Sequence, residues 1–183
     1  MKLKMYTRTG SKKSELGQIR RSGDIPAVLY SRGQSNEMIA VDGVEFKTIL
    51  RKITAGRLST TQFTLVNEGR EVSAIVKGIE YHPTTYEVLH MDFMIPKEVV
   101  KVRVPVEFVG VADCQGIKLG GFLRPVLRYV KVECPADKIP SSFSIDIRDL
   151  MIGQSKRLSD LQMPEGVRSL VNKDVVIVVI AKK

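Results

Sequence analysis

The sequence predicts a mainly β protein with a few helices, divided into two domains. Of its 183 residues, 43% are hydrophobic, which is enough to bury a core. Apolar and polar residues alternate in many short runs bounded by Gly, Pro or Asp, as in half-buried strands. Periodicity and composition shift near residues 95–97. We therefore expect a domain at residues 1–94 that is mostly β with one or two helices, and an all-β sandwich or open barrel at residues 95–183.

The first domain should begin with a strand, a short helix and two further strands. Residues 2–9 alternate as a strand does, and a loop follows. Ser14 is placed to cap a helix over residues 15–22, and Gly23 suits the left-handed position past the end of that helix. Strands are then expected over residues 25–31 and 37–41, joined by a turn that contains Gly33.

The clearest helix is expected over residues 43–55. Asp42 followed by Glu45 resembles a capping box, and Gly56 should end the helix. Its apolar residues recur at helical spacing and form one stripe: Phe46, Ile49, Leu50 and Ile53. The spacing of apolar residues then predicts a strand pair at residues 61–66 and 71–81 around a turn at residues 67–70, followed by a strand at residues 88–93.

The second half of the chain is expected to form strands, with no long helix. Alternation is strict over residues 99–108, and Pro105, which has no amide proton, should place this strand on an edge or bend it. Further strand signals lie at residues 122–134, 144–147 and 174–181, with Gly, Pro and Asp turns between them. This pattern is typical of a sandwich or an open barrel.

Positive charge is concentrated at the start of the chain. The formal net charge is +9, from 29 Lys or Arg and 20 Asp or Glu. Residues 1–32 carry a net +6, residues 33–92 carry −2, and residues 93–183 carry +5 in a diffuse distribution. A solvated basic tail is one interpretation of the first segment. The segment runs directly into the apolar strand at residues 25–30, however, which favours a basic surface held on a fold and a polyanionic partner.

Several classes of protein are not expected from this sequence. The longest purely apolar run, residues 175–181, is far shorter than a membrane span, and no secretory signal is visible, so we expect a soluble cytoplasmic protein with no membrane partner. Cys114 and Cys134 are too few for a disulfide framework or a zinc site. Neither cysteine stands beside His82 or His90, and there is no glycine-rich phosphate-binding loop. We therefore expect no enzyme, no metal and no cofactor.

His90 and Asp92 form the most informative polar pair. On the expected strand they share one face, about 7 Å apart along the backbone, while Met91 and Phe93 point to the other face. One interpretation is an ordinary polar outer surface. The other is a hydrogen-bonding pair for nucleic acid. Aromatic residues make up only 6% of the sequence and there is no Trp. This favours a protein that recognises folded, double-helical RNA over one that stacks the bases of single-stranded RNA on aromatic rings.

Several motifs in order resemble one family. The run Arg-Arg-Ser-Gly-Asp-Ile-Pro-Ala-Val-Leu-Tyr at residues 20–30, Val-Glu-Phe at 44–46 and His-Met-Asp-Phe at 90–93 resemble bacterial large-subunit ribosomal protein twenty-five. This is the 5S-rRNA-binding family that includes the general stress protein CTC. The segments at residues 104–110, 120–123, 138–140 and 149–153 look like landmarks of the long form, which adds a C-terminal β domain.

The resemblance implies a fold, a partner and a set of contacts. It implies a six-stranded antiparallel β-barrel with helices at residues 1–94 that binds the loop E region of 5S rRNA in the large ribosomal subunit. It also implies a structural protein that acts as a monomer beside neighbouring ribosomal proteins. The RNA-binding residues that it suggests, together with the last basic residue of the N-terminal segment, are Arg8, Lys12, Lys13, Arg20, Arg21, Tyr30, Arg32, Lys77, His90 and Asp92.

The sequence departs from the family pattern at three places. Gly17 and Gln18 precede the end of the short helix, where many members carry Arg. Ser31 follows Tyr30 in place of Gly or Asn, and Ser-Lys-Lys-Ser at residues 11–14 replaces the Gly-Lys-Gly loop of short forms, which makes the contacts of Lys12 and Lys13 less secure than that of Arg8. An alternative function is a stress-related protein-interaction module that acts through the C-terminal β domain.

Overall fold

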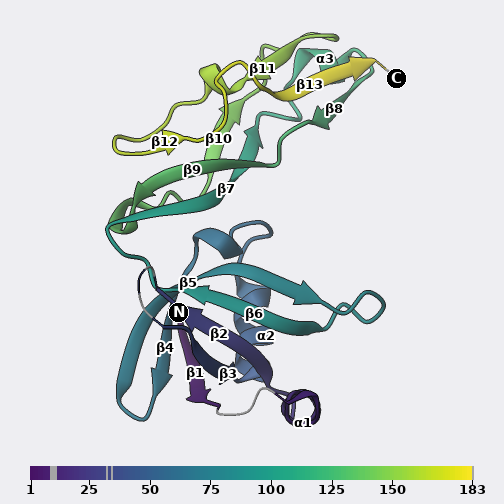
Figure 1. The fold of residues 1–183 in the computed structure, drawn as a ribbon. Helices are drawn as coiled ribbons and strands as arrows, with labels where there is room; N and C mark the ends of the chain where they lie inside the picture. Colours follow the sequence, from purple (N-terminus) through teal and green to yellow (C-terminus); the bar gives the residue numbers. More distant parts are fainter. Residues whose placement is uncertain (9–11, 32, 34, 183) are drawn as a thin grey trace. The chain divides into compact units, whose positions relative to one another are not determined.

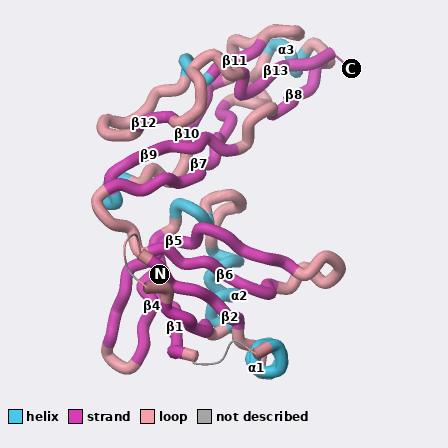
Figure 2. The backbone as a smooth tube through the Cα atoms, in the orientation of Figure 1, coloured by secondary structure: helices cyan, strands magenta, loops and turns pink. Residues whose placement is uncertain are grey.

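The computed structural model describes residues 1–8, 12–31, 33 and 35–182, and it divides into two units, Met1–Glu98 and Val99–Lys183. Strands are the commonest regular element in both units (Figure 2). The helices of the first unit are α1 (Lys13–Arg21) and α2 (Gly43–Lys52), with a 3₁₀ turn at Leu58–Thr60.

Six strands of the first unit close into a barrel (Figure 1). They are β1 (Lys2–Thr7), β2 (Ile25–Tyr30), β3 (Glu37–Val41), β4 (Gln62–Asn67), β5 (Arg70–Tyr81) and β6 (Val88–Met94). Their order around the barrel is β1-β3-β2-β6-β5-β4. The six-stranded barrel that the resemblance implies is thus confirmed. Two of the strand pairs, β1–β4 and β2–β6, are parallel, so the barrel is not wholly antiparallel.

Alternation along the strands fills the barrel with apolar side chains. The rings of Phe46, Phe63 and Phe93 are fully buried, and the centroid of Phe63 lies 6.4 Å from that of Phe46 and 6.0 Å from that of Phe93. Phe46 comes from α2, and the rest of its predicted stripe, Ile49, Leu50 and Ile53, packs against the same core. The amphipathic pattern of residues 43–55 is therefore confirmed.

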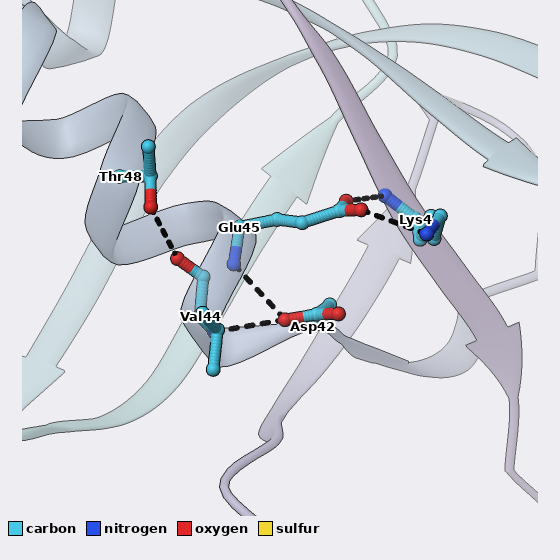
Figure 3. Close-up of polar contacts among 5 residues, drawn as sticks. All are labelled: Lys4, Asp42, Val44, Glu45 and Thr48. Atoms are coloured by element: carbon cyan, nitrogen blue, oxygen red, sulfur yellow. Dashed lines mark hydrogen bonds and ion pairs between the residues drawn. The ribbon is translucent and has the colours of Figure 1, made fainter.

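The cap of α2 differs from the prediction in one contact. Asp42 accepts hydrogen bonds from the backbone N–H groups of Val44 and Glu45, at 2.8 and 3.0 Å, as an N-cap does (Figure 3). The Glu45 carboxylate does not complete a capping box. It accepts from the backbone N–H of Lys4 and pairs with the Lys4 ammonium, each at 3.0 Å, and so connects α2 to β1. The helix ends at Lys52, before Gly56, because Ile53 turns to an extended conformation.

Helix α1 begins earlier than the sequence suggests. It starts at Lys13, so Ser14 lies inside the first turn and is not the cap. Lys12 holds the cap position in an extended conformation, with no side-chain capping bond, and its carbonyl accepts from the N–H groups of Glu15 and Leu16. Gly23 follows the helix with a φ of 93°, as predicted. Thr9 of the predicted first strand, with Gly10 and Ser11 of the loop, lies outside the described residues.

The hairpin of β4 and β5 is confirmed. The two strands pair antiparallel from Gln62 to Asn67, and the turn between them places Glu68 at φ 41° and Gly69 at φ 93°. Positive φ at both central residues gives the turn a twist that matches the strands. Further along β5 the register with β6 shifts between Val76 and Gly78, so the strand carries a bulge there.

The second unit contains two sheets, in the orders β10-β7-β9-β12 and β11-β13-β8. Its strands are β7 (Val99–Val109), β8 (Gly121–Pro125), β9 (Tyr129–Pro135), β10 (Phe143–Asp146), β11 (Ser155–Arg157), β12 (Arg168–Ser169) and β13 (Val176–Lys182). Its short helices are α3 (Gln115–Lys118) and 3₁₀ turns at Ala136–Lys138 and Leu158–Asp160. The all-β character of this half is thus confirmed.

Two details of the second unit differ from the prediction. The predicted strand signal at residues 122–134 divides into β8 and β9, which belong to different sheets. β7 lies between β10 and β9 in the strand order and not at the end of the sheet, but its two halves pair with different neighbours: with β9 as far as Pro105 and with β10 from Val106 onward. Pro105 lies where the strand changes partner, a place where the missing amide proton interrupts the ladder least.

Candidate nucleic-acid interface

His90 and Asp92 lie side by side on the outside of the barrel. Met91 and Phe93 alternate with them on β6 and are fully buried, so the two polar side chains face outward. His90 Nδ1 lies 3.3 Å from Asp92 Oδ1, with 23% of the His90 side chain and 47% of the Asp92 side chain exposed. The geometry expected from the alternation is confirmed. The pair offers both a hydrogen-bond acceptor and an imidazole whose other nitrogen can face a ligand.

Gly78 gives the Asp92 carboxylate its place. It stands opposite Asp92 in the β5–β6 register, and a Cβ at this position would lie 2.9 Å from Asp92 Oδ2. Any larger residue would push the carboxylate away from its present position. Sequence reasoning did not identify Gly78, although a glycine inside a strand is a known signal for a close approach. Lys77 precedes it at the bulge and is exposed.

Tyr30 flanks the pair from the neighbouring strand. β2 runs parallel to β6, and Tyr30 is opposite Met94, one outward position beyond Asp92. Partial burial raises the pKa of the Tyr30 hydroxyl, and the negative charge of Asp92 raises it further. Tyr30 therefore remains a neutral hydrogen-bond donor beside the carboxylate.

Helix α1 is attached to β6 next to His90. The Arg20 guanidinium donates from Nε and Nη2 to the carbonyl oxygen of Leu89, at 3.2 and 3.0 Å. Arg20 stands in the last turn of α1 and Leu89 directly precedes His90. This fork of two hydrogen bonds fixes the end of the basic helix beside the polar pair. Sequence reasoning predicted Arg20 as a contact to RNA, and it missed the acceptor within the chain.

The turn after α1 is fixed from two further sides. The Tyr6 hydroxyl donates a short hydrogen bond to the Asp24 carboxylate, which also accepts from Ser22 at 3.3 Å. Burial and the bond to Asp24 raise the pKa of Tyr6 well above its usual value. The first residue of α2, Gly43, packs against the carbonyl of Gly23 so closely that a Cβ would lie 2.1 Å from that oxygen. The position of α1 therefore depends on β1, α2 and β6 together.

The other predicted residues occupy three places. Arg8 follows β1 and is hydrogen-bonded to β3. Its backbone N–H donates to the carbonyl of Met38 and its Nε donates to the carbonyl of Ile39, each at 3.0 Å. Lys12 and Lys13 are exposed at the start of α1. Arg21 is exposed at its end, and its Nη1 would lie 3.4 Å from a Cβ placed on Gly17. Arg32 lies outside the described residues. The structure thus brings together Arg20, Tyr30, His90 and Asp92, with Lys77 on the adjoining strand β5. Arg8 is not part of this group and is hydrogen-bonded to β3 instead.

The described residues give little support for catalysis by a cysteine or for a metal site. Cys114 and Cys134 are buried free thiols, and burial raises the pKa of Cys134, which disfavours a thiolate nucleophile. The Nδ1 of His82 accepts from the backbone N–H groups of Thr84 and Thr85 and so orders a turn. Within the described part of the chain, no group of three or more His, Cys, Asp or Glu residues could hold a metal. None of the helices described here is long and apolar enough to cross a membrane.

Comparison with known proteins gives matches along the whole chain. Residues 3–93 match the Ribosomal L25p family, and residues 99–183 match the C-terminal domain of ribosomal protein TL5. The large ribosomal subunit protein bL25 of Chlamydia trachomatis serovar A is 40% identical over 185 residues, which covers 100% of both chains. The chain belongs to the ribosomal L25p family. The bL25 proteins of Chlamydia abortus and Chlamydia pneumoniae are 40% and 39% identical over the same full coverage.

Membership of the L25p family defines the general role. The chain is a ribosomal protein of the family's long form, with a structural and not an enzymatic role in the cytoplasm. The first family match ends at residue 93 and the second begins at residue 99. The two units divide between Glu98 and Val99, next to the start of the second match. In the first unit, the features that a specific function has to account for are the outward pair His90 and Asp92 on β6 and the basic helix α1 beside it.

Proposed function

We propose that this chain is a structural constituent of the large ribosomal subunit that binds 5S rRNA, at its loop E region, through the first unit. Its relatives are named as proteins of the large ribosomal subunit, and this supports the same assembly for the present chain. The +6 of residues 1–32 supports an RNA partner. The second unit would then have a separate task in the same particle.

One observation carries the proposal: a hydrogen-bonding pair stands on the barrel surface directly beside a basic helix. The Arg20 bonds to Leu89 hold α1 next to His90. His90 lies 3.3 Å from Asp92. Phosphates near Arg8, Lys12, Lys13 and Arg21 would supply affinity without sequence information. The pair would supply selectivity through base edges or ribose hydroxyls in the wide minor groove.

The carboxylate is the informative member of the pair. A negative charge on a surface that binds RNA repels the phosphates, so it weakens non-specific attraction. Asp92 is nonetheless 47% exposed there, and Gly78 leaves room for it. A carboxylate in this position suits a defined donor, such as an exocyclic amino group or a 2′-hydroxyl. The surface therefore fits a folded RNA of particular shape better than an arbitrary helix.

The test is binding of the full chain to a 5S rRNA fragment. The fragment should contain loop E, and the matched control should replace loop E with regular base pairs of the same length. We expect tighter binding to the loop E fragment. If about five phosphates are contacted, the slope of log affinity against log salt should be about −4. Equal affinity for both fragments, or a flat salt dependence, would contradict the proposal.

A footprint would locate the surface on both molecules. Chemical probing of 5S rRNA should show protection at loop E when the wild-type chain is bound. His90→Ala and Asp92→Ala should each reduce this protection, while Glu68→Ala, on the β4–β5 turn, should leave it unchanged. Protection elsewhere in 5S rRNA with loop E still reactive would reject the loop E assignment and retain the 5S rRNA partner.

A further inference from the structure

The end of the β5–β6 hairpin differs in charge from the rest of the chain. We call residues 80–87 the hairpin tip. Residues 78–96, which include the tip, contain no Lys or Arg, although the whole chain has a formal net charge of +9. Two exposed carboxylates, Glu80 and Glu87, stand at the two sides of the tip. The hairpin tip is therefore an acidic point on a basic protein, and it repels the phosphates that the N-terminal segment attracts.

Hydrogen bonds within the hairpin tip fix its shape. The backbone N–H of His82 donates to the carbonyl of Glu87 at 2.7 Å, and the N–H of Tyr86 donates to the carbonyl of His82 at 3.0 Å. His82 Nδ1 accepts from the N–H groups of Thr84 and Thr85, at 3.3 and 3.2 Å. A partner at the tip would therefore meet a loop that is already ordered, which lowers the entropic cost of binding.

The ordered tip presents the ring of Tyr86 to solvent. Its φ is 56°, a left-handed conformation that a bulky residue seldom adopts and that persists where the surrounding structure holds it. Tyr86 is 78% exposed, the highest value among the exposed large hydrophobic side chains in the described part of the chain. Figure 1 shows the loop that joins β5 and β6 at the outer end of this hairpin. The fold thus holds an aromatic ring in an unfavourable backbone conformation without burying it, which favours a role in binding.

The composition of the hairpin tip fits a basic protein surface. Tyrosine is enriched at protein–protein interfaces, and Tyr81 in the same tip is 47% exposed. A tyrosine ring attracts Arg and Lys side chains by cation–π contact, and nearby carboxylates attract the same side chains. RNA is the competing partner, because a base can stack on Tyr86. Two carboxylates, and the absence of a cation from residues 78–96 to hold a phosphate, disfavour RNA.

We propose that the hairpin tip is a docking site for a neighbouring protein of the large ribosomal subunit, whose basic surface receives the Tyr86 ring. Glu80 and Glu87 attract the Arg or Lys side chains around that ring. Glu80 is opposite His90 in the register of β5 and β6, so the docked protein lies next to the surface proposed for 5S rRNA. The inference goes beyond the 5S rRNA proposal, because it assigns a second class of partner. It rests on the ribosomal family of the chain and not on which RNA the first unit binds.

The first test measures binding of the full chain to two probes. One probe is the large subunit assembled without this chain, and the other is the protein-free rRNA of the same subunit. Tyr86→Gly removes the ring at a φ that glycine adopts readily, and the matched control Tyr86→Phe keeps the ring. We expect Tyr86→Gly to bind large subunits about tenfold more weakly and to bind protein-free rRNA as wild type does. Tyr86→Phe should stay within about threefold of wild type on both probes.

Charge reversal distinguishes a protein from RNA by the sign of its effect. Glu87→Lys places a cation on the tip, which repels a basic protein and attracts RNA. Glu68→Lys makes the same change at the exposed β4–β5 turn and measures the general attraction of an added cation to the particle. Relative to Glu68→Lys, we expect Glu87→Lys to bind large subunits about fivefold more weakly. Equal or tighter binding of Glu87→Lys would overturn the proposal.

Four other results would also overturn the proposal. Equal losses of Tyr86→Gly on both probes would place RNA against the ring, and no loss on either probe would leave the ring without a partner. A thermal midpoint of Tyr86→Gly below that of wild type would assign the ring to the fold. A photoreactive phenylalanine analogue in place of Tyr86 should cross-link to a protein of the large subunit, and a cross-link to rRNA or to a second copy of this chain would contradict that.

The 5S rRNA fragment provides a separate readout. Tyr86→Gly should bind the loop E fragment with wild-type affinity, because the ring lies outside the surface proposed for that RNA. Weaker binding to the fragment would reassign the ring to RNA and overturn the docking site. If wild type itself shows no preference for loop E, the 5S rRNA proposal fails, and the comparison of large subunits with protein-free rRNA still decides whether a protein docks at the hairpin tip.

Discussion

The two units carry similar net charge on β frameworks, but they distribute that charge in different ways. In the first unit the basic residues are neighbours in sequence, at residues 1–32, and hydrogen bonds from Arg20 and Tyr6 then place their helix beside His90. In the second unit the +5 of residues 93–183 is spread along the sequence, with no comparable basic segment. A count of charge in sequence windows therefore identifies the basic surface of the first unit, and it identifies no such surface in the second.

The largest effect should come from the core that supports the basic surface of the first unit. Phe63 is fully buried between Phe46 and Phe93. Phe63→Ala should lower the free energy of unfolding of the first unit by about 3–5 kcal/mol, because it removes a buried ring and leaves a cavity. That is a large fraction of the stability of a domain this size. Urea denaturation followed by far-UV circular dichroism would measure it, and binding to the 5S rRNA fragment should fail with it.

The matched control is Phe143→Ala in the second unit. Phe143 is 3% exposed, so its removal should destabilise that unit by a similar amount. We expect affinity for the 5S rRNA fragment to stay within about threefold of wild type, since the proposed site lies wholly in the first unit. Loss of 5S rRNA binding in Phe143→Ala would contradict this prediction, because the RNA-binding surface of the first unit would then depend on the second unit.

Adjacent arginines on α1 should separate positioning from phosphate contact. Arg20 donates two hydrogen bonds to Leu89, whereas Arg21 is exposed at the same end of the helix. Arg20→Gln should weaken binding to the 5S rRNA fragment by about 1 kcal/mol through misplacement of α1, with little change in salt slope. Arg21→Gln should reduce the slope by about 1. Salt titrations of both variants measure the difference. Equal slope changes would return Arg20 to the class of direct phosphate contacts.

The Arg20 contact also shows where prediction from sequence stops. The helix stripe of Phe46, the hairpin turn at Glu68 and Gly69, and the outward position of His90 and Asp92 all follow from local periodicity and turn chemistry. Contacts between distant segments do not follow from such patterns. The acceptor of Arg20 lies 69 residues away, and Glu45 is drawn from its own helix to Lys4, 41 residues away. A local motif predicts that a charged group needs a partner, but the tertiary fold selects which partner it finds.

Gly78 should have a smaller, local effect on the RNA-binding surface of the first unit. In Gly78→Ala, the new Cβ would lie 2.9 Å from Asp92 Oδ2, so the carboxylate must move and the 3.3 Å contact with His90 must change. We expect about fivefold weaker binding to the loop E fragment, or about 1 kcal/mol. Thermal stability should change little, because a terminal carboxylate can yield. Ser73→Ala, at an exposed position of the same strand, should bind as wild type. A Gly78→Ala variant with wild-type affinity would remove the Asp92 position from the recognition surface.

The smallest effect should appear as a dependence on pH in the hydrogen bond that fixes the turn after α1. Burial and the bond to Asp24 raise the pKa of Tyr6 above its ordinary value of 10.0. A group with a raised pKa in the folded state contributes stability that is fully present below the unfolded pKa and is lost as the pH rises through the folded value. The advantage of wild type over Tyr6→Phe should therefore be constant from pH 7 to about pH 9 and should shrink above about pH 10. Urea denaturation of both proteins across this range measures the difference, in which the other tyrosines and the lysines cancel. An advantage that stays constant above pH 10 would show that folding does not raise the pKa of the Tyr6 hydroxyl, which would contradict a hydrogen bond from Tyr6 to Asp24 that fixes the turn after α1.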